Sequence, residues 1–333
     1  MIGLLVMSEE SFAAHFDQVR LDRLKTLVTL PDPVRVDELD SPAARERLAE
    51  AEVLITSWGV PQLSGARLAA APRLRAVFHA AGSVRALAAD ELWERDIVVT
   101  SAADANAIPV AEYTLAAIIF AGKKAPFLAA DASTAYRGWG HPDGFGDLSN
   151  FRRSIGIVGF SRTGRRVVEL LRTLDGPTVL VADPYADAAA VAAAGAKLVD
   201  LDELLPQVDV LSLHAPALPS THRMIGTAEL AKLPDHATVV NTARGSLIDS
   251  SALAEECRSG RLFAILDVTD PEPLPAGSAL RSVPNVMITP HIAGSLGSEI
   301  HRLTDHALDE LTRWLAGEPL HGLITAETFP LTA

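Results

Sequence analysis

The sequence predicts an α/β protein in which doubly wound parallel sheets are covered by helices on both faces, and three observations predict it. Short apolar runs alternate with Ala- and Leu-rich stretches along almost the whole chain. These runs are continuous instead of alternating with polar residues, which is typical of strands buried on both faces. The 333 residues, 48% of them hydrophobic, suffice for two domains of about 150 residues each.

Four strands and two helices are expected in the first part of the chain. The strands are apolar runs bounded by polar or turn residues, at 4–7, 53–56, 74–79 and 97–100. One helix is expected to begin at Ser41, a polar N-cap that is followed by proline. A long apolar helix is expected to begin at Pro109. Glycines and prolines crowd residues 136–150, which predicts a loop or linker.

The alternation of strands and helices continues more strongly after that loop. A helix is expected at 249–259, with Asp249 as its N-cap and Gly260 as its stop. The last long helix covers 297–316 and ends at Gly317. The expected strands of this part are 154–160, 178–182, 208–213, 238–241, 262–268 and 286–289.

Charge and cysteine content exclude several classes of protein. Lys and Arg number 29 against 42 Asp and Glu, and the resulting net charge of −13 repels phosphate backbones, so no nucleic-acid partner is expected. The single cysteine, Cys257, excludes an intramolecular disulfide and fits a cytoplasmic protein. The N-terminus lacks the basic segment of a signal peptide. The longest apolar run, 115–121, is far shorter than the about 20 residues of a membrane helix, so no membrane is expected.

Residues 155–164 place small side chains at a predicted strand-to-helix turn. A dinucleotide-binding turn needs three small residues, for the tight turn, for close approach of the backbone to the pyrophosphate, and for packing of the helix on the strand. Gly159, Ser161 and Gly164 occupy these positions, so serine replaces the middle glycine. The following helix N-terminus, where Arg162 lies, offers free N–H groups to phosphates. By itself the motif is equally compatible with an ordinary turn that carries a solvated basic face.

An acidic residue follows the next predicted strand. A carboxylate at this place accepts hydrogen bonds from the ribose hydroxyls of NAD and repels the 2′-phosphate of NADP. Asp183 follows strand 178–182, and no arginine occurs in 184–187, so NAD is the expected cofactor. Alone, Asp183 would be a common turn residue before proline. Together with the turn and its helix, it predicts an NAD site.

Three polar residues follow strand ends late in the chain, where ligands of a parallel sheet bind. Arg244 suits bidentate recognition of a carboxylate. His291 can transfer a proton near neutral pH, and Glu272 beside it would fix the tautomer of the ring. Considered alone, Arg244 could be a surface ion-pair partner, Glu272 an acidic loop residue, and His291 a structural histidine whose ring nitrogens are hydrogen-bonded within the protein. On one sheet edge beside a nucleotide turn, the set predicts a catalytic site.

These motifs resemble those of the D-isomer-specific 2-hydroxyacid dehydrogenases, which include D-lactate, glycerate, glyoxylate/hydroxypyruvate and phosphoglycerate dehydrogenases. The resemblance covers nearly the whole chain. It implies a Rossmann NAD-binding domain at 105–298, inserted into a flavodoxin-like substrate domain made of 1–104 and 299–333. The segments that carry the resemblance, in the order of the family, are 109–114, 156–165, 213–216, 241–245, 266–273 and 289–294.

The resemblance also implies the role of each site residue. His291 would be the general acid/base, Glu272 its partner, and Arg244 the residue that holds the substrate carboxylate and polarises the carbonyl. Backbone N–H groups of the loop Ala81, Gly82 and Ser83 would bind the substrate, a small 2-hydroxy or 2-oxo acid. The cofactor-binding residues would be Gly159, Ser161, Arg162, Thr163, Gly164, Asp183, Pro216, Thr242, Asp267 and Gly294.

Two segments depart from the family pattern. Ser161 stands where the middle glycine of the nucleotide turn is expected. The substrate loop reads His-Ala-Ala-Gly-Ser-Val-Arg at 79–85, where the family commonly has Arg-Ala-Gly-x-Gly-x-Asp. This loop, together with Thr269 in place of a frequent aromatic residue, leaves open which acid the protein accepts.

Other functions compete with the dehydrogenase. A binding or regulatory protein that senses NAD(H) on the same fold is the main alternative, and turnover of NADH distinguishes the two. The segment 159–164 is one residue too long for the nucleophile elbow of a serine hydrolase. His301 and His306 are off one helical face and no His-Glu-x-x-His motif occurs, so no metal is expected. The apolar helix from Pro109 is either a core helix or, as the family implies, a homodimer interface.

Overall fold

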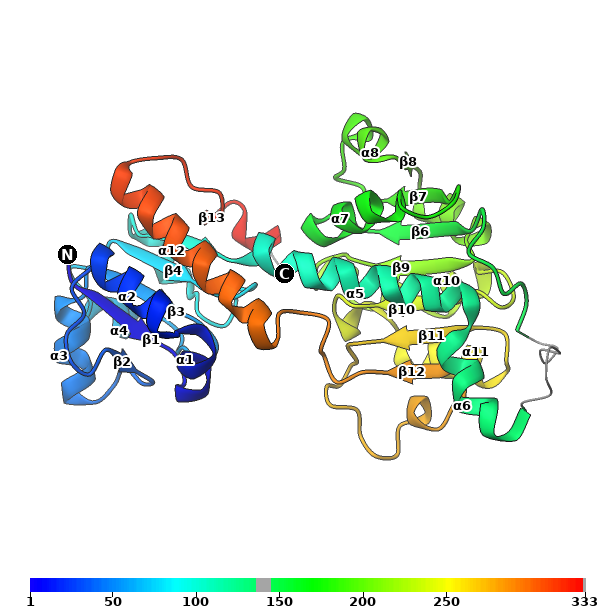
Figure 1. Cartoon of the computed structure of the whole chain (residues 1–333), viewed down its shortest axis with the longest axis horizontal. Helices are drawn as coiled ribbons and strands as arrows, with labels where there is room; N and C mark the ends of the chain where they lie inside the picture. Colours follow the sequence, from blue (N-terminus) through cyan, green and yellow to red (C-terminus); the bar gives the residue numbers. More distant parts are fainter. Residues whose placement is uncertain (136–144, 332–333) are drawn as a thin grey trace. The chain divides into compact units, whose positions relative to one another are not determined.

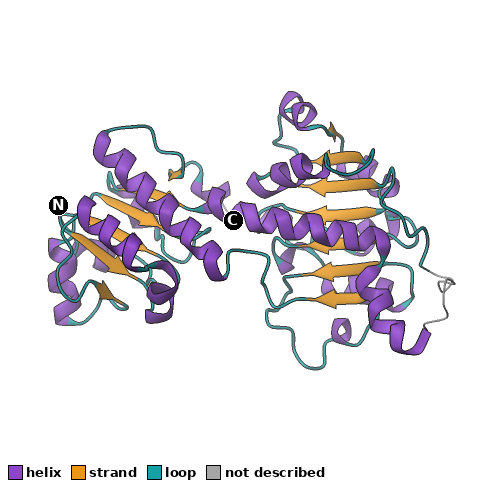
Figure 2. Ribbon diagram, viewed as in Figure 1, coloured by secondary structure: helices purple, strands orange, loops and turns teal. Residues whose placement is uncertain are grey.

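A computed structural model of the chain describes residues 1–135 and 145–331 and divides it into two compact units (Figures 1 and 2). The first unit contains Met1–Ala107 and Ser295–Ala333, and the second contains Ile108–Gly294. The sequence analysis placed the two domain boundaries after residue 104 and after residue 298. Most of the loop predicted at 136–150 lies outside the described residues. Both units are α/β structures built on one sheet, so the predicted fold class is confirmed.

The first unit has a six-stranded sheet in the order β13-β5-β4-β3-β1-β2, parallel except for the β13–β5 pair. Apolar side chains cover both faces of this sheet. The chain returns to the unit through α12, which packs against α1, α2 and β4. The strands are β1 (Gly3–Val6), β2 (Arg35–Val36), β3 (Val53–Thr56), β4 (Ala76–His79), β5 (Val98–Ser101) and β13 (Leu323–Ile324). The helices are α1 (Glu9–His15), α2 (Gln18–Leu27), α3 (Pro42–Glu50), α4 (Gly65–Ala69) and α12 (Ile300–Ala316).

The second unit has a seven-stranded sheet in the order β12-β11-β10-β9-β6-β7-β8, parallel in every pair. The order reverses beside β6, which creates the crevice where open α/β sheets bind ligands. The strands are β6 (Ser154–Val158), β7 (Thr178–Ala182), β8 (Lys197–Leu198), β9 (Val210–Leu213), β10 (Thr238–Asn241), β11 (Phe263–Leu266) and β12 (Val286–Ile288). The helices are α5 (Ala103–Lys123), whose residues up to Ala107 belong to the first unit, α6 (Ala125–Ala135), α7 (Arg162–Leu171), α8 (Ala188–Ala194), α9 (Leu201–Leu204), α10 (Thr227–Lys232) and α11 (Ser250–Arg258).

All ten predicted strands are present, and the helix signals were mostly correct. Ser41 caps α3 by accepting from the amide of Ala44, and Asp249 caps α11 in the same manner. The predicted start of the long helix at Pro109 is wrong, because α5 begins at Ala103 and Pro109 lies inside it. The expected helix 297–316 consists of a 3-10 turn at Gly297–Glu299 followed by α12.

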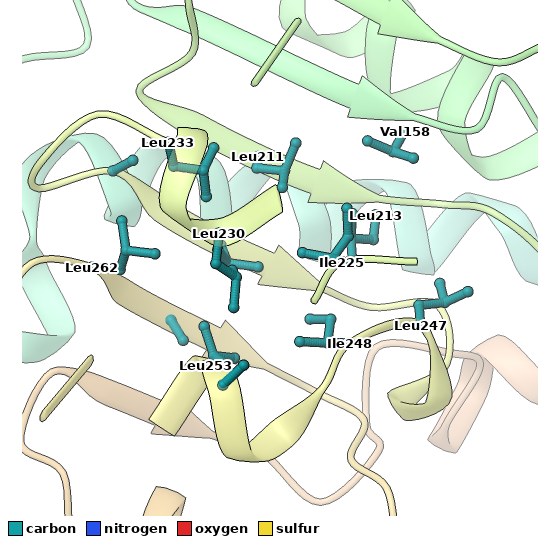
Figure 3. Close-up of a cluster of buried hydrophobic side chains, with 14 of the residues drawn as sticks. Val158, Leu211, Leu213, Ile225, Leu230, Leu233, Leu247, Ile248, Leu253 and Leu262 are labelled. Carbon is teal, nitrogen blue, oxygen red and sulfur yellow. The ribbon is translucent and has the colours of Figure 1, made fainter. Parts of the chain in front are cut away.

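Two apolar layers hold the helices on the second sheet. On one face, α10 and α11 contribute Leu230 and Leu253 to a buried cluster that also contains Leu211 of β9 (Figure 3). On the other face, α5 lies across the sheet (Figure 1) and contributes Ile118 to a second buried cluster, which also contains Val240 of β10. By length and composition α5 could cross a membrane, but 56% of its apolar window is buried in the structure, as in a core helix.

Lys124, which directly follows the last residue of α5, is buried. The residue is 4% exposed, and its Nζ donates to the carbonyl of His236 and to Oγ1 of Thr238, each at 2.6 Å. The ammonium also lies 4.2 Å from the ring centre of Phe263. Burial lowers the pKa of Lys124 to about 7, with a further contribution from the positive charge of Arg153. The second core therefore contains a charged group whose protonation changes near neutral pH.

Candidate active site

The candidate site is built on the carboxyl ends of the parallel strands in the second unit. Asp183 follows β7, Thr242 follows β10, Asp267 follows β11 and Thr289 follows β12. Because every strand pair of this sheet is parallel, these residues lie along the same sheet edge. Sequence reasoning predicted this edge as the functional one.

The structure brings His291 and Glu272 together. Nδ1 of His291 lies 2.6 Å from Oε1 of Glu272, and the two side chains are 50% and 42% exposed. An ionised carboxylate can only accept a hydrogen bond, so Nδ1 donates and the tautomer of the neutral ring is fixed. Nε2 is then the nitrogen that can exchange a proton with a ligand. The pair has the geometry of a histidine acid/base oriented by a carboxylate.

The backbone at His291 has an uncommon conformation. Its φ of 54° lies in the left-handed region, which residues with a side chain adopt rarely and which is often found at functional sites. The amide of His291 donates to the carbonyl of Asp267 at 2.9 Å. The Asp267 carboxylate accepts from the amides of Ile292 at 2.8 Å and Ala293 at 2.9 Å. Asp267 therefore holds the backbone on both sides of the histidine side chain.

Arg244 lies on the loop after β10. Its Nη1 donates to the carbonyl of Ala243 at 2.7 Å, and its own carbonyl accepts from the side-chain amide of Asn241 at 2.9 Å. At the start of α11, Oγ of Ser250 donates to the carbonyl of Asp270, two residues before Glu272. The start of α11, which follows the Arg244 loop along the chain, is thus hydrogen-bonded to the loop that carries Glu272.

A cavity of about 630 Å³ adjoins the histidine pair. His291, Glu272 and Asp267 line one part of it, and apolar side chains such as Leu280 and Ile288 line another. Its size and its mixture of a few polar groups with an apolar wall are typical of small-molecule sites.

The geometry of the nucleotide turn shows that serine can occupy the position of the middle glycine. Gly159 has φ 96°, and a Cβ there would lie 2.6 Å from the amide nitrogen of Ala215, so this position requires glycine. A Cβ on Gly164 would collide with the carbonyl oxygen of Gly159. Ser161 has an ordinary φ of −68° and is the N-cap of α7, where its Oγ accepts from the amide of Gly164. Serine therefore introduces no backbone strain.

The same turn has the features that a dinucleotide requires. Helix α7 begins at Arg162, directly after this turn, and the N-terminus of a helix is an environment that suits a pyrophosphate. The carboxylate of Asp183 is held by the amides of Phe160 and Tyr185, each at 2.8 Å. Arg165, on α7, pairs with Glu169 at 3.1 Å. The chemistry of this turn and of the Asp183 carboxylate fits the pyrophosphate and ribose of NAD.

Other predicted cofactor residues lie on neighbouring loops. The carbonyl of Pro216, after β9, accepts from the hydroxyl of Thr221. Thr242 is 7% exposed and its hydroxyl lies 2.8 Å from that of Thr114 on α5. Gly294 is the last residue of the second unit.

The predicted substrate loop, Ala81 to Ser83, follows β4 in the first unit. The carbonyl of Ala81 accepts from the amide of Ala102 at 3.0 Å, and a Cβ added at Gly82 would lie 3.2 Å from Nδ2 of Asn106. Burial lowers the pKa of His79, at the end of β4, to about 4, while a hydrogen bond with the backbone of Ser83 acts in the opposite direction. His79 is therefore a neutral group that supports the loop.

Sequence reasoning did not single out Tyr113 and Thr289, whose hydroxyl groups lie 2.7 Å apart near this site. Both residues lie in segments that carry the family resemblance. Hydroxyl groups are common, however, and the contact between these two is visible only in three dimensions. Among the described residues no group of three His, Cys, Asp or Glu could hold a metal ion.

Comparison with known proteins assigns the family. Residues 120–293 match the family described as D-isomer specific 2-hydroxyacid dehydrogenase, NAD binding domain. The chain is 33% identical over 297 residues to D-3-phosphoglycerate dehydrogenase of Mycobacterium tuberculosis, an alignment that covers 88% of this chain and 55% of that protein. It is 34% identical over 170 residues to hydroxypyruvate reductase of Blautia hydrogenotrophica, covering 51% of this chain and 52% of that protein.

A solved structure agrees with this assignment over almost the whole chain. The TT0316 protein from Thermus thermophilus superposes with a TM-score of 0.75 at 29% identity and covers 98% of this chain and 100% of that chain. The chain spans about half the length of the curated relatives that it matches. Fold, sheet edge and sequence match agree, and the chain belongs to the D-isomer specific 2-hydroxyacid dehydrogenase family, with an NAD-binding domain in its second unit.

Proposed function

We propose that this protein is an NAD-dependent oxidoreductase that interconverts a small 2-hydroxy acid and the corresponding 2-oxo acid. The observation that carries the proposal is the 2.6 Å contact between His291 and Glu272 at the ligand-binding edge of an NAD-binding domain. The reaction joins a 2-oxo acid, NADH and a proton to give the 2-hydroxy acid and NAD⁺. NAD, when bound, supplies the hydride chemistry.

The histidine pair supplies the proton. In the reducing direction, Nε2 of His291 donates a proton to the oxygen on C2 as the carbonyl becomes a hydroxyl. Glu272 holds Nδ1, so that the ring keeps its orientation through the transfer. In the oxidising direction the neutral ring accepts the same proton. A positioned acid/base of this kind contributes about 10²–10⁴ in rate.

Arg244 neutralises the substrate. Its guanidinium would bind the carboxylate of the acid and stabilise the charge that develops on the C2 oxygen. Backbone N–H groups of Ala81, Gly82 and Ser83 remain predicted ligands of the substrate.

The cofactor is assigned to the crevice beside β6. The amides of Arg162 and Thr163, at the turn formed by Gly159, Ser161 and Gly164, would bind the pyrophosphate, and Asp183 would bind the ribose hydroxyls. The remaining predicted ligands are Pro216, Thr242, Asp267 and Gly294.

The proposal is tested by following NADH oxidation with a panel of 2-oxo acids that includes glyoxylate, hydroxypyruvate and pyruvate. We expect turnover with at least one acid. We also expect His291→Ala and Arg244→Ala to lower kcat/KM by about 10²-fold or more, while calorimetry shows unchanged NADH affinity. Full activity in either variant would reject the assigned roles. Tight NADH binding with no turnover on any acid would favour a protein that senses NAD(H).

We also propose that the protein is a cytoplasmic homodimer. Phe120 on α5 is 49% exposed beside half-buried apolar neighbours, an apolar surface that a second copy would cover. The one cysteine, Cys257, is buried, which raises the pKa of its thiol to about 12 and makes it unreactive, as suits a reducing compartment. Light scattering at micromolar concentration is expected to give the mass of two chains, and the mass of one chain would contradict the dimer.

A further inference from the structure

A chain of hydroxyl groups connects helix α5 to the loop that carries His291. The hydroxyl of Tyr113 lies 2.7 Å from Oγ1 of Thr289. Oγ1 of Thr289 in turn lies 2.6 Å from Oδ1 of Asp267. The three residues come from α5, the end of β12 and the end of β11, so the contacts tie together separate elements of the second unit.

The direction of each hydrogen bond follows from the chemistry of the groups. The ionised carboxylate of Asp267 can only accept, so Thr289 donates to it. The single proton of the Thr289 hydroxyl is then used, and Tyr113 must donate to Thr289. Burial raises the pKa of Tyr113, which keeps its hydroxyl protonated as a donor. The order is therefore Tyr113 to Thr289 to Asp267.

The chain ends on the backbone of the catalytic loop. Asp267 is 2% exposed, and besides Thr289 it accepts from the amides of Ile292 and Ala293. These amides directly follow His291, whose φ of 54° must be maintained by the bonds around it. A carboxylate that turned away from these amides would release the loop, and the hydroxyl of Thr289 holds one of its two oxygens in place.

We propose that Tyr113 and Thr289 are positioning residues for His291, which they orient through Asp267. This inference rests on the proposed function, because it gives the two hydroxyls a part in the same reaction. Neither hydroxyl has to touch the substrate. The ring of Tyr113 packs in the core of the second unit, whereas its hydroxyl serves the loop, so the two contributions can be separated by removing one oxygen atom.

The first test is a kinetic comparison of Tyr113→Phe, Thr289→Val and Thr289→Ser. We expect kcat to fall about tenfold in Thr289→Val and about threefold in Tyr113→Phe, since a hydrogen bond to a charged group is lost or weakened. KM for NADH should change by less than about twofold, and Thr289→Ser, which keeps the hydroxyl, should retain kcat within about twofold. Thr312→Val is the matched control, because it removes a hydroxyl that donates to the carbonyl of Leu308 within α12, in the first unit.

A double-mutant cycle tests the order of the chain. If Tyr113 acts through Thr289, Tyr113→Phe has no further effect on kcat in the Thr289→Val background. Effects that multiply independently, or an unchanged kcat in Thr289→Val, would overturn the proposal. A fall in Thr312→Val equal to that in Thr289→Val would also overturn it, because the effect would then follow from any lost hydroxyl.

The second test does not depend on turnover. Amide hydrogen exchange of Ile292 and Ala293, measured by NMR on the full chain without ligands, should become about tenfold faster in Thr289→Val and remain unchanged in Thr312→Val. Unchanged exchange at both amides in Thr289→Val would refute the positioning role. If the unmodified protein turns over no acid but exchange responds as expected, the proposed function fails and the structural role of the chain stands.

Discussion

The buried ammonium of Lys124 makes the stability of the protein depend on pH, and Lys124→Met tests this. The folded protein binds the lysine proton with a pKa of about 7, against an ordinary value of 10.5. Well below pH 7 both the folded and the unfolded state carry the lysine proton, so Lys124 contributes no pH dependence to the free energy of unfolding there. Between pH 7 and 10.5 the unfolded state binds more protons, and the free energy of unfolding rises with pH.

The size of this rise follows from the pKa difference. Each pH unit inside the window contributes up to about 1.4 kcal/mol, which amounts to about 3 kcal/mol between pH 7 and pH 9.5. Methionine has a similar length and no charge, so the variant lacks this dependence. It also leaves the carbonyl of His236 and the hydroxyl of Thr238 without their shared donor, a contribution of about 1–3 kcal/mol against the variant that does not depend on pH and does not affect the comparison between pH values.

Urea denaturation followed by circular dichroism at pH 7 and pH 9.5 measures the difference. We expect the unmodified protein to gain about 3 kcal/mol relative to Lys124→Met between the two pH values. The other titrating groups are common to both proteins and cancel in the comparison. Lys123→Met, at the exposed neighbouring lysine, is the matched control and should follow the unmodified protein. Parallel pH dependence of the unmodified protein and Lys124→Met would refute the reasoning.

Three further predictions concern the active site and the nucleotide turn. Glu272→Gln should lower kcat in NADH oxidation by about tenfold or more, because Nδ1 of His291 loses its ionised acceptor; a rate equal to that of the unmodified protein would contradict the pairing. Asp183→Ser should raise the ratio of kcat/KM for NADPH to that for NADH at least about tenfold, since charge repulsion of about 1–4 kcal/mol is removed; an unchanged ratio would speak against ribose recognition by this carboxylate. Gly164→Ala should lower the free energy of unfolding by about 1–3 kcal/mol in urea, because the added methyl collides with the carbonyl of Gly159; unaltered stability would show that α7 can move away from β6 at no cost.

Local signals in the sequence predicted the architecture, because each is a short-range physical requirement. Continuous apolar runs marked the buried strands, and Ser41 and Asp249 marked helix starts through their caps. The two-residue strands β2, β8 and β13 were not predicted, since two residues contain no periodicity. Pro109 suggested a helix start by its usual place in a first turn, but the helix continues through it.

The site was predictable where residue chemistry is specific and hidden where it is not. An imidazole and a carboxylate after neighbouring strands led to the His291–Glu272 contact. The hydroxyl of Thr289 and the internal hydrogen bonds of Asp267 depend on which loops meet in space, and the sequence contains no spacing that reveals them. The family resemblance assigned Asp267 to the cofactor, whereas the folded chain alone already engages both of its carboxylate oxygens.

The left-handed backbone at His291 also limits how the importance of its imidazole can be measured. Asparagine and glycine tolerate that conformation, whereas valine and isoleucine oppose it through their branched Cβ. An inactive valine variant would thus combine a missing ring with a displaced main chain. An inactive asparagine variant would leave the peptide path unaltered and report on the ring alone, so the replacement chosen at this codon decides what a loss of activity means.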